Sequence, residues 1–296
     1  MVEQPITSSI RFLPLYAKIP GYERFFCSYL LCGEKYALVD VGPTAVSHSI
    51  FPALEEQGIG PERIDYILLT HIHMDHAGGI GAAVREMKNA KVIAHGRARS
   101  HLTDPTRLWN ASLRVLGDLA KQYGTIEPVP DDRIIDAVDE MGLDLGQDLR
   151  VRLYLTPGHA YHHLSLFDSA SGVLIVGEAA GVCTNGALRP STPPPFEFEE
   201  ALTSIDRLIA LQPEMICFAH IGCYHDAVEL LKLARRQLVE WHRIAKPAAD
   251  DGVSPERILD VLKRYDRSLD YLLDLDVDEY EREHKMIINS IIGIST

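Results

Sequence analysis

Apolar residues along this chain follow two alternating spacings, which predict strands interleaved with helices. Short runs rich in Val, Ile, Leu, Tyr and Phe, bounded by Gly or Pro, are typical of β-strands. The first three runs follow one another closely and predict a β-meander. In chain order we expect strands over residues 10–18, 25–32, 35–41, 64–69, 91–95, 149–155, 164–167, 173–177 and 215–219.

Between these runs the apolar positions recur at helical intervals. Ser254-Pro255 also offers a good N-cap followed by proline at the first helical position. The stretch 246–252 is the only plausible linker, so we expect a body over residues 1–245, with a helical insertion at about 96–135, and a helical C-terminal extension over 246–296. Helices are predicted over 44–57, within 96–123, over 197–210 and 224–245, from 254 onward and over 276–292.

Charge and composition narrow the possible partners. The chain of 296 residues has a formal net charge of −13 and shows no basic stripe, which argues against nucleic acid as a partner. No apolar run approaches the length of a membrane span, and residues 1–5 lack the basic and apolar regions of a signal peptide. We therefore expect a cytoplasmic protein that binds neither nucleic acid nor membrane.

The cysteine pattern predicts reduced thiols. There are five cysteines, an odd number, and none forms a C-x-x-C pair. This pattern counts against a disulfide framework and against a zinc ribbon. We expect the cysteines to act as small buried apolar residues.

The most informative stretch is THIHMDH, residues 70–76, directly after a predicted strand. A turn requires Gly, Asn or Pro, but it does not require three imidazoles and a carboxylate. Neutral imidazole and carboxylate are ligands for zinc and for other first-row metals. The motif therefore predicts a metal site. Close approach of the backbone to this site is one reason for the helix-disfavouring Gly78, Gly79 and Gly81 that follow.

Three more predicted strands end in a potential ligand. In open α/β arrangements, binding sites lie outside the carboxyl ends of the strands, so such residues can meet although they are far apart in sequence. Asp40 also ends a strand, where capping the next helix and a functional role are equally open. The strand-end candidates are His71, His159 after Thr156-Pro157-Gly158, Glu178 and His220.

Taken together, these residues resemble the metallo-β-lactamase fold superfamily over about residues 10–225. The resemblance rests on VDVG at 39–42, THIHMDHAGG at 70–79, TPGH at 156–159, Gly177-Glu178 and Ala219-His220. It implies an α/β fold, an αββα sandwich of two mixed sheets packed face to face with helices outside, here with a C-terminal helical extension.

The resemblance also implies a dinuclear metal centre and the residues that form it. Glu178 occupies the position where the family usually has a bridging aspartate, and its extra methylene leaves the form of the bridge open. Asp40 and His163 match positions that support the ligands through hydrogen bonds. The implied ligands are His71, His73 and His159 for the first ion, and Asp75, His76 and His220 for the second.

The function expected from this site is metal-dependent hydrolysis of a small ester, thioester or lactone by a metal-bound hydroxide. Zinc is the expected ion, with two ions bound and iron or manganese as alternatives. Asp75 would orient the nucleophile and carry a proton, with His220 as the second catalytic residue. Residues 156–159 are also similar to the glyoxalase II branch of the superfamily, but the chain shows no convincing set of glutathione-binding residues.

The alternative is a non-haem iron oxidoreductase of the persulfide dioxygenase type, which the same superfamily includes. His71 or His73, together with His159 and Glu178, would supply its two-histidine, one-carboxylate set. We expect the insertion and the proline loop at 190–196 to form the walls of the cleft. A homodimer is the expected assembly, because Ile287, Ile288, Ile291 and Ile292 form a strongly apolar helix face.

Overall fold

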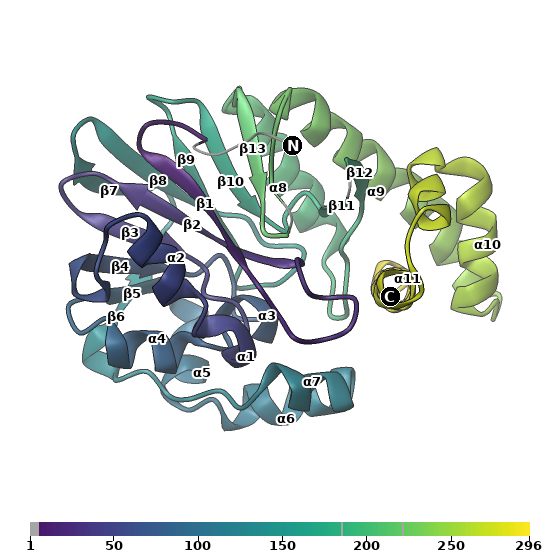
Figure 1. Cartoon of the computed structure of the whole chain (residues 1–296). Coiled ribbons are helices and arrows are strands. Elements are labelled where there is room, and N and C mark those ends of the chain that lie inside the picture. Colours follow the sequence, from purple (N-terminus) through teal and green to yellow (C-terminus); the bar gives the residue numbers. More distant parts are fainter. Residues whose placement is uncertain (1–5, 185, 221) are drawn as a thin grey trace.

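A computed structural model describes residues 6–184, 186–220 and 222–296, and it contains two six-stranded sheets packed face to face (Figure 1). The first sheet has the order β1-β2-β3-β4-β5-β6. Its first three strands pair antiparallel, and β3 to β6 pair parallel. The strands are β1 (Ile10–Leu15), β2 (Phe26–Cys32), β3 (Tyr36–Val39), β4 (Ile64–Leu68), β5 (Lys91–His95) and β6 (Ile134–Ala137).

The second sheet has the order β14-β13-β10-β9-β8-β7, in which only β10 and β13 pair parallel. A separate hairpin follows β10, formed by β11 (Val182–Thr184) and β12 (Ala187–Arg189). The strands of the second sheet are β7 (Met141–Gly146), β8 (Leu149–Leu155), β9 (Leu164–Asp168), β10 (Val173–Gly177), β13 (Met215–Phe218) and β14 (Cys223–His225).

Alternation of side chains along the strands produces three apolar layers. Successive strand residues point to opposite faces, so Leu31 of β2 and Ile175 of β10 join the core between the sheets. Leu30 of β2 packs instead against the helices outside the first sheet, and Leu174 of β10 against those outside the second. Both faces of each sheet are therefore buried, which explains the nearly continuous apolar runs in the sequence.

Helices cover both outer faces, and further helices follow at the C-terminal end of the chain (Figure 1). This arrangement confirms the predicted αββα sandwich. The helices beside the first sheet are α1 (Thr44–Ser47), α2 (Ile50–Glu56), α3 (Met74–Ala77), α4 (Ile80–Glu86), α5 (Arg99–Thr103), α6 (Thr106–Leu116) and α7 (Asp118–Tyr123). Those beside the second sheet and at the C-terminal end are α8 (Phe198–Ala210), α9 (Ala227–Asp250), α10 (Pro255–Tyr265) and α11 (Val277–Ile294). Short 3₁₀ helices span η1 (Pro61–Arg63), η2 (Gly96–Ala98), η3 (Asp131–Arg133) and η4 (Arg267–Leu273).

The predicted linker at 246–252 is wrong, because α9 continues through most of it to Asp250. Pro247 lies in the last turn, and its carbonyl accepts a hydrogen bond from the Asp251 amide. Ala248 and Ala249 pack against the apolar cluster outside the second sheet. Tertiary packing therefore outweighs the composition of this stretch.

The division of the chain at residue 245 stays a prediction. The predicted absence of a signal peptide concerns residues 1–5, which lie outside the described range.

Within the described ranges, none of the helices combines the length and the apolar character that crossing a bilayer requires.

The expectation of reduced thiols is wrong for one pair of cysteines. Cys217 of β13 and Cys223 of β14 form a disulfide. The two residues are direct partners across this antiparallel pair, a register that their spacing in the sequence does not reveal. Cys27, Cys32 and Cys183 are free.

The glycines after the THIHMDH motif are explained by close packing against neighbouring segments and not by the metal site. A Cβ atom on Gly79 would lie 2.4 Å from the Cβ atom of Ser47 in α1, and one on Gly81 would lie 2.5 Å from the Cβ atom of Glu127. The chain after α3 therefore passes too close to its neighbours for a larger side chain.

A buried ion pair between Arg189 and Glu283 connects the β11–β12 hairpin to helix α11. The Arg189 Nε atom donates to Glu283 at 2.7 Å, and both side chains are fully buried. The Tyr271 hydroxyl also donates to Glu283. Burial alone would raise the pKa of the Glu283 carboxyl, but Arg189 lowers it to about 2.

The Glu283→Gln variant is expected to lose about 3 kcal/mol of stability at pH 7, because Arg189 would keep a buried charge without its partner. The folded-state pKa of Glu283 lies below its ordinary value of 4.5. Its contribution is therefore complete above about pH 5 and is lost as the pH falls toward 2. Urea unfolding at pH 7 and pH 3.5 measures both effects.

The matched control is Glu281→Gln on the same helix. Glu281 forms an exposed pair with Lys285 at 3.6 Å, so this variant should change stability by less than about 0.5 kcal/mol. An equal loss of stability between pH 7 and pH 3.5 in the wild type and in Glu283→Gln would contradict this assignment.

Candidate metal centre

The strand ends meet at one edge of the sandwich, where the structure brings together all seven predicted ligands. His71 follows β4, His73 is the N-cap of α3, and Asp75 and His76 lie within that helix. The second sheet contributes three residues, each directly or shortly after a strand. These are His159 after β8, Glu178 after β10 and His220 after β13.

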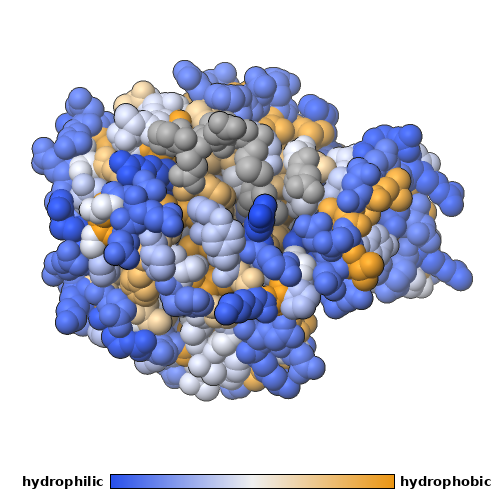
Figure 2. Space-filling model, viewed as in Figure 1, coloured by the Kyte–Doolittle hydropathy of each residue, from blue (hydrophilic) through white to orange (hydrophobic). Residues whose placement is uncertain are grey.

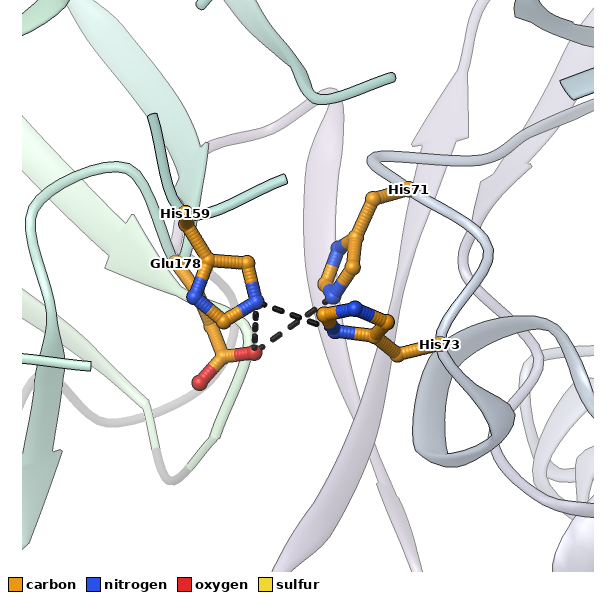
Figure 3. A group of neighbouring side chains, drawn as sticks. All are labelled: His71, His73, His159 and Glu178. Atoms are coloured by element: carbon orange, nitrogen blue, oxygen red, sulfur yellow. Dashed lines mark hydrogen bonds and ion pairs between the residues drawn. The ribbon is translucent and has the colours of Figure 1, made fainter. Parts of the chain in front are cut away.

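The seven residues form two overlapping groups that share Glu178. Within each group, one potential ligand atom from every residue lies within 4.8 Å of the others. Figure 3 shows the first group, with His71 and His73 pointing toward His159 and Glu178 from the opposite side. The groups are His71, His73, His159 and Glu178, and Asp75, His76, Glu178 and His220.

A single oxygen of Glu178 lies at the junction of the two groups. Its Oε2 atom is 3.1 Å from His159 Nε2, 3.4 Å from His71 Nε2 and 3.3 Å from His76 Nε2. The other oxygen, Oε1, is 3.9 Å from His220 Nε2. The longer side chain therefore still places one carboxylate oxygen between both groups.

Four histidines have their outer ring nitrogen, Nδ1, held by an oxygen atom. His76 Nδ1 is 3.1 Å from Asp40 Oδ2, and His71 Nδ1 is 3.0 Å from the Thr70 hydroxyl, which itself donates to Asp40. His159 Nδ1 donates to the Ser191 carbonyl, and His220 Nδ1 to that of Phe25. Each contact favours a proton on Nδ1, so that a neutral ring directs its Nε2 lone pair toward the other candidate ligands.

Three of these four Nε2 atoms are buried without a hydrogen-bond donor beside them. Among the described residues, the Nε2 atoms of His71, His76 and His220 have no hydrogen-bond partner. An unpaired buried polar atom is costly, and lone pairs converging beside a carboxylate are what a divalent cation requires. The residues therefore fit a metal ion.

Burial keeps three of these imidazoles neutral, which is the form that binds metal. It lowers the pKa of His73 and of His220 to about 4, and that of His71 well below its ordinary value. Nearby carboxylates outweigh burial and raise the pKa of His76 and of His159. Burial opposes ionisation of Glu178, but neighbouring His159 outweighs it and holds the pKa of the carboxyl well below its usual range.

Asp40 supports the site and does not cap a helix. Its Oδ1 atom accepts from the Thr70 amide at 2.8 Å, and its Oδ2 atom accepts from the Thr70 hydroxyl at 2.7 Å. Helix α1 has no side-chain cap, so the capping role that the sequence left open is absent there. Through Thr70 and His76, Asp40 fixes the orientation of the first-sheet histidines.

His163 acts on the backbone of Glu178. Its Nε2 atom accepts from the Glu178 amide at 3.0 Å, while its Nδ1 atom contacts the Thr156 hydroxyl at 2.8 Å. A Cβ atom on Gly177, whose φ is +59°, would lie 2.4 Å from His163 Nε2. Only glycine permits this approach, and the imidazole then fixes where Glu178 begins.

Ser191 is a residue that sequence reasoning missed. Its hydroxyl donates to Glu178 Oε1 at 2.9 Å, and its carbonyl accepts from His159 Nδ1 at 2.9 Å. One residue therefore holds two candidate ligands. Ser191 follows a hairpin too short to show a period in the sequence, so the only signal was the neighbouring proline-rich loop.

Comparison with known proteins identifies relatives of this chain and structures of similar fold. The family model described as the metallo-beta-lactamase superfamily matches residues 27–220. The metallo-beta-lactamase fold-containing protein ST1585 of Sulfurisphaera tokodaii is 37% identical over 201 residues, which covers 66% of this chain and 72% of that protein. A hydroxyacylglutathione hydrolase of Pseudomonas fluorescens is 30% identical over 195 residues, covering 65% of this chain and 57% of that protein.

Among solved structures, the crystal structure of ST1585 from Sulfolobus tokodaii matches with a TM-score of 0.74 and 25% identity. That match covers 97% of this chain and 98% of the other, and thus includes most of the C-terminal helices. The structure of the metallo-beta-lactamase family protein TTHA1429 from Thermus thermophilus has a TM-score of 0.67 at 23% identity, covers 94% of this chain and 95% of that one, and supports the fold alone.

Proposed function

The chain belongs to the metallo-beta-lactamase superfamily, and from this premise we propose that it hydrolyses a small ester, thioester or lactone with two zinc ions. The supporting observation is the convergence of three unpartnered Nε2 atoms with Asp75 and Glu178. In this proposal His71, His73 and His159 would hold one ion, and Asp75, His76 and His220 would hold the other. Glu178 belongs to both groups of candidate ligands.

A metal ion at this site would polarise a carbonyl oxygen and lower the pKa of a coordinated water toward neutrality. The chain's own contribution is to position and to move protons. The Asp75 side chain is 17% exposed, and its Oδ2 atom lies 3.6 Å from both His76 Nε2 and His220 Nε2. Burial would raise the pKa of Asp75, but His76 lowers it to about 2, so the carboxylate is available to accept a proton.

Support for ester or thioester chemistry comes from several similar proteins that are hydroxyacylglutathione hydrolases. The test is elemental analysis of the purified protein, followed by assay of the zinc-supplemented protein on thioesters, lactones, phosphodiesters and persulfides. We expect about two metal ions per chain and turnover of at least one carbonyl substrate. Bound iron with oxygen consumption on persulfide would replace this proposal with the dioxygenase, and fewer than one ion per chain without turnover would refute it.

The Ser191→Ala variant is expected to weaken metal binding by about 10- to 100-fold, because Glu178 would lose the hydroxyl that positions it, while the Ser191 carbonyl would still accept from His159. Competition with a chromophoric chelator measures this affinity without relying on activity. In a Glu178→Asp background the effect of Ser191→Ala should shrink, since the shorter carboxylate would not reach the serine hydroxyl.

Ser171→Ala provides the matched control. The Ser171 hydroxyl also donates to a carboxylate, that of Asp168, but the two lie at the turn between β9 and β10. We expect its metal affinity to equal that of the wild type. Equal losses in the two serine variants would mean that Ser191 has no specific role at the site.

A further inference from the structure

A cavity of about 850 Å³ opens beside the candidate metal centre, with Asp75 in its lining. Its walls come from three segments that are distant in sequence: the stretch after β1 that contains Ile19 and Tyr22, the insertion helices α6 and α7, and helix α11. In Figure 2 the molecular surface is indented between the C-terminal helices at the right and α6 and α7 at the lower edge. Because Asp75 belongs both to the cavity lining and to the candidate centre, the cavity adjoins the site.

This lining differs in part from the sequence prediction. The insertion forms one wall, as expected, but the opposite wall is α11 and not the proline loop. Pro190, Ser191 and Thr192 instead line a much smaller cavity beside His159 and Glu178. The four isoleucines of α11 face two different environments. Ile287 and Ile291 are fully buried in the chain's own core, while Ile288 and Ile292 line the large cavity. The homodimer stays a prediction, and half of the face that suggested it is used within the chain.

Both walls present apolar side chains to the cavity. Val115, Leu116 and Leu119 lie on the insertion side, and Ile288 and Ile292 lie opposite. Val115 is 64% exposed and Ile292 is 41% exposed. Large apolar side chains gathered around a cavity beside a polar site are typical of a pocket that holds an apolar group of a ligand.

The charges around the cavity are predominantly negative. Arg282 is one of its two cationic groups, but its guanidinium is buried, donates to the Gly21 carbonyl and to Glu283, and lies 4.7 Å from the Phe25 ring. The other, Lys285, is exposed and lies 3.6 Å from Glu281. Five carboxylates therefore face one buried and one exposed cation. The carboxylates in the lining are Asp75, Asp118, Glu256, Asp278 and Glu281.

From these walls and charges we propose that the substrate is an uncharged ester or lactone with an aliphatic arm. The arm lies in the groove between α6–α7 and α11, and the reacting carbonyl lies at the Asp75 end. This inference rests on the proposed hydrolase function and makes its substrate more specific. The excess of carboxylates repels anionic substrates, so a glutathione thioester, with its two carboxylates, is a poor fit despite the similarity to hydroxyacylglutathione hydrolases.

The first experiment measures hydrolysis by the zinc-supplemented full chain. Its substrates are p-nitrophenyl acetate, butyrate, hexanoate and octanoate, together with the anionic p-nitrophenyl hemisuccinate as a partner for butyrate. We expect kcat/KM to rise about two- to fourfold for each added methylene until the groove is filled. Butyrate should exceed hemisuccinate by at least about tenfold. Equal rates along the series, or a preference for hemisuccinate, would overturn this inference and leave the hydrolase intact.

The second experiment measures binding without turnover, by calorimetric titration with propanamide and octanamide. We expect octanamide to bind at least about tenfold more tightly. If octanamide binds in this way and no ester is hydrolysed, the groove is supported and the proposed hydrolase function fails. If octanamide binds no better than propanamide, the groove assignment is overturned.

A pair of valines supplies the matched variants. Val115→Asp places a charge in the groove and should lower the octanoate-to-acetate ratio of kcat/KM by about tenfold. It should weaken octanamide binding by a similar factor. Val138→Asp changes a residue of nearly equal exposure, 61%, in the turn between β6 and β7. It should leave both quantities unchanged. Equal effects of the two substitutions would refute the assignment of the groove.

Discussion

The His71→Ala variant is expected to lose at least about a thousandfold in kcat/KM on any ester that the wild type hydrolyses. His71 lies after β4 with its Nε2 atom 3.4 Å from Glu178 Oε2, and it is buried at the centre of the first group. Its removal would leave that group with two imidazoles. Metal catalysis contributes several kcal/mol to lowering the barrier, and about 1.4 kcal/mol corresponds to a tenfold change in rate.

Metal content and folding must be measured beside the rate. We expect elemental analysis of His71→Ala to show the loss of about one ion per chain, with a circular dichroism spectrum like that of the wild type. His225→Ala removes an exposed histidine at the end of β14 and should change neither the rate nor the metal content. Wild-type activity in His71→Ala would remove the basis for the proposed mechanism.

Adding two equivalents of zinc to chelator-treated protein is expected to raise the melting temperature by about 10 °C. The apoprotein buries the unpaired Nε2 atoms of His71, His76 and His220. A ligand that binds only the folded state at about a thousand times its dissociation constant adds about 4 kcal/mol of stability. For a chain of this size, each kcal/mol corresponds to a few degrees. Differential scanning calorimetry measures the shift.

The His76→Ala variant tests whether this shift comes from the proposed centre. His76 lies in the second group, and its Nδ1 atom is held by Asp40. We expect the zinc-induced shift to fall to less than half in this variant and to persist in His225→Ala. A shift of the same size in all three proteins would place the stabilising zinc elsewhere.

The candidate metal ligands were more predictable from the sequence than the residues that hold them in place. Histidines and carboxylates at strand ends stand out locally, because packing alone does not require them, and strands that end at one edge of a sandwich bring such residues together. Ser191 carries no such signal, since a serine after a short hairpin is ordinary in composition. Its role depends on where β12 places the chain relative to Glu178, which is a tertiary property.

In the fold as well, elements with a clear local sequence pattern were predicted, and elements that depend on tertiary contacts were not. Buried strands such as β5 and β10 were predicted with correct bounds, because their apolar runs end at clear turn residues. The hairpin β11–β12 was missed because strands of three residues show no period. Helix α9 was predicted too short because Pro247 and the polar residues after it are typical of a linker. In the folded protein, contacts with the neighbouring helices keep this last turn helical.

The segment 189–192 links the last helix to the candidate metal centre. Arg189 pairs with Glu283, and the Thr192 hydroxyl donates to the Ser290 carbonyl, both on α11, while Ser191 between them holds Glu178 and His159. The helix that forms one wall of the groove thus also supports two candidate metal ligands. Mutations in α11 that adapt the groove to a new substrate would disturb metal affinity as well, so during evolution substrate preference and metal affinity would be expected to change together.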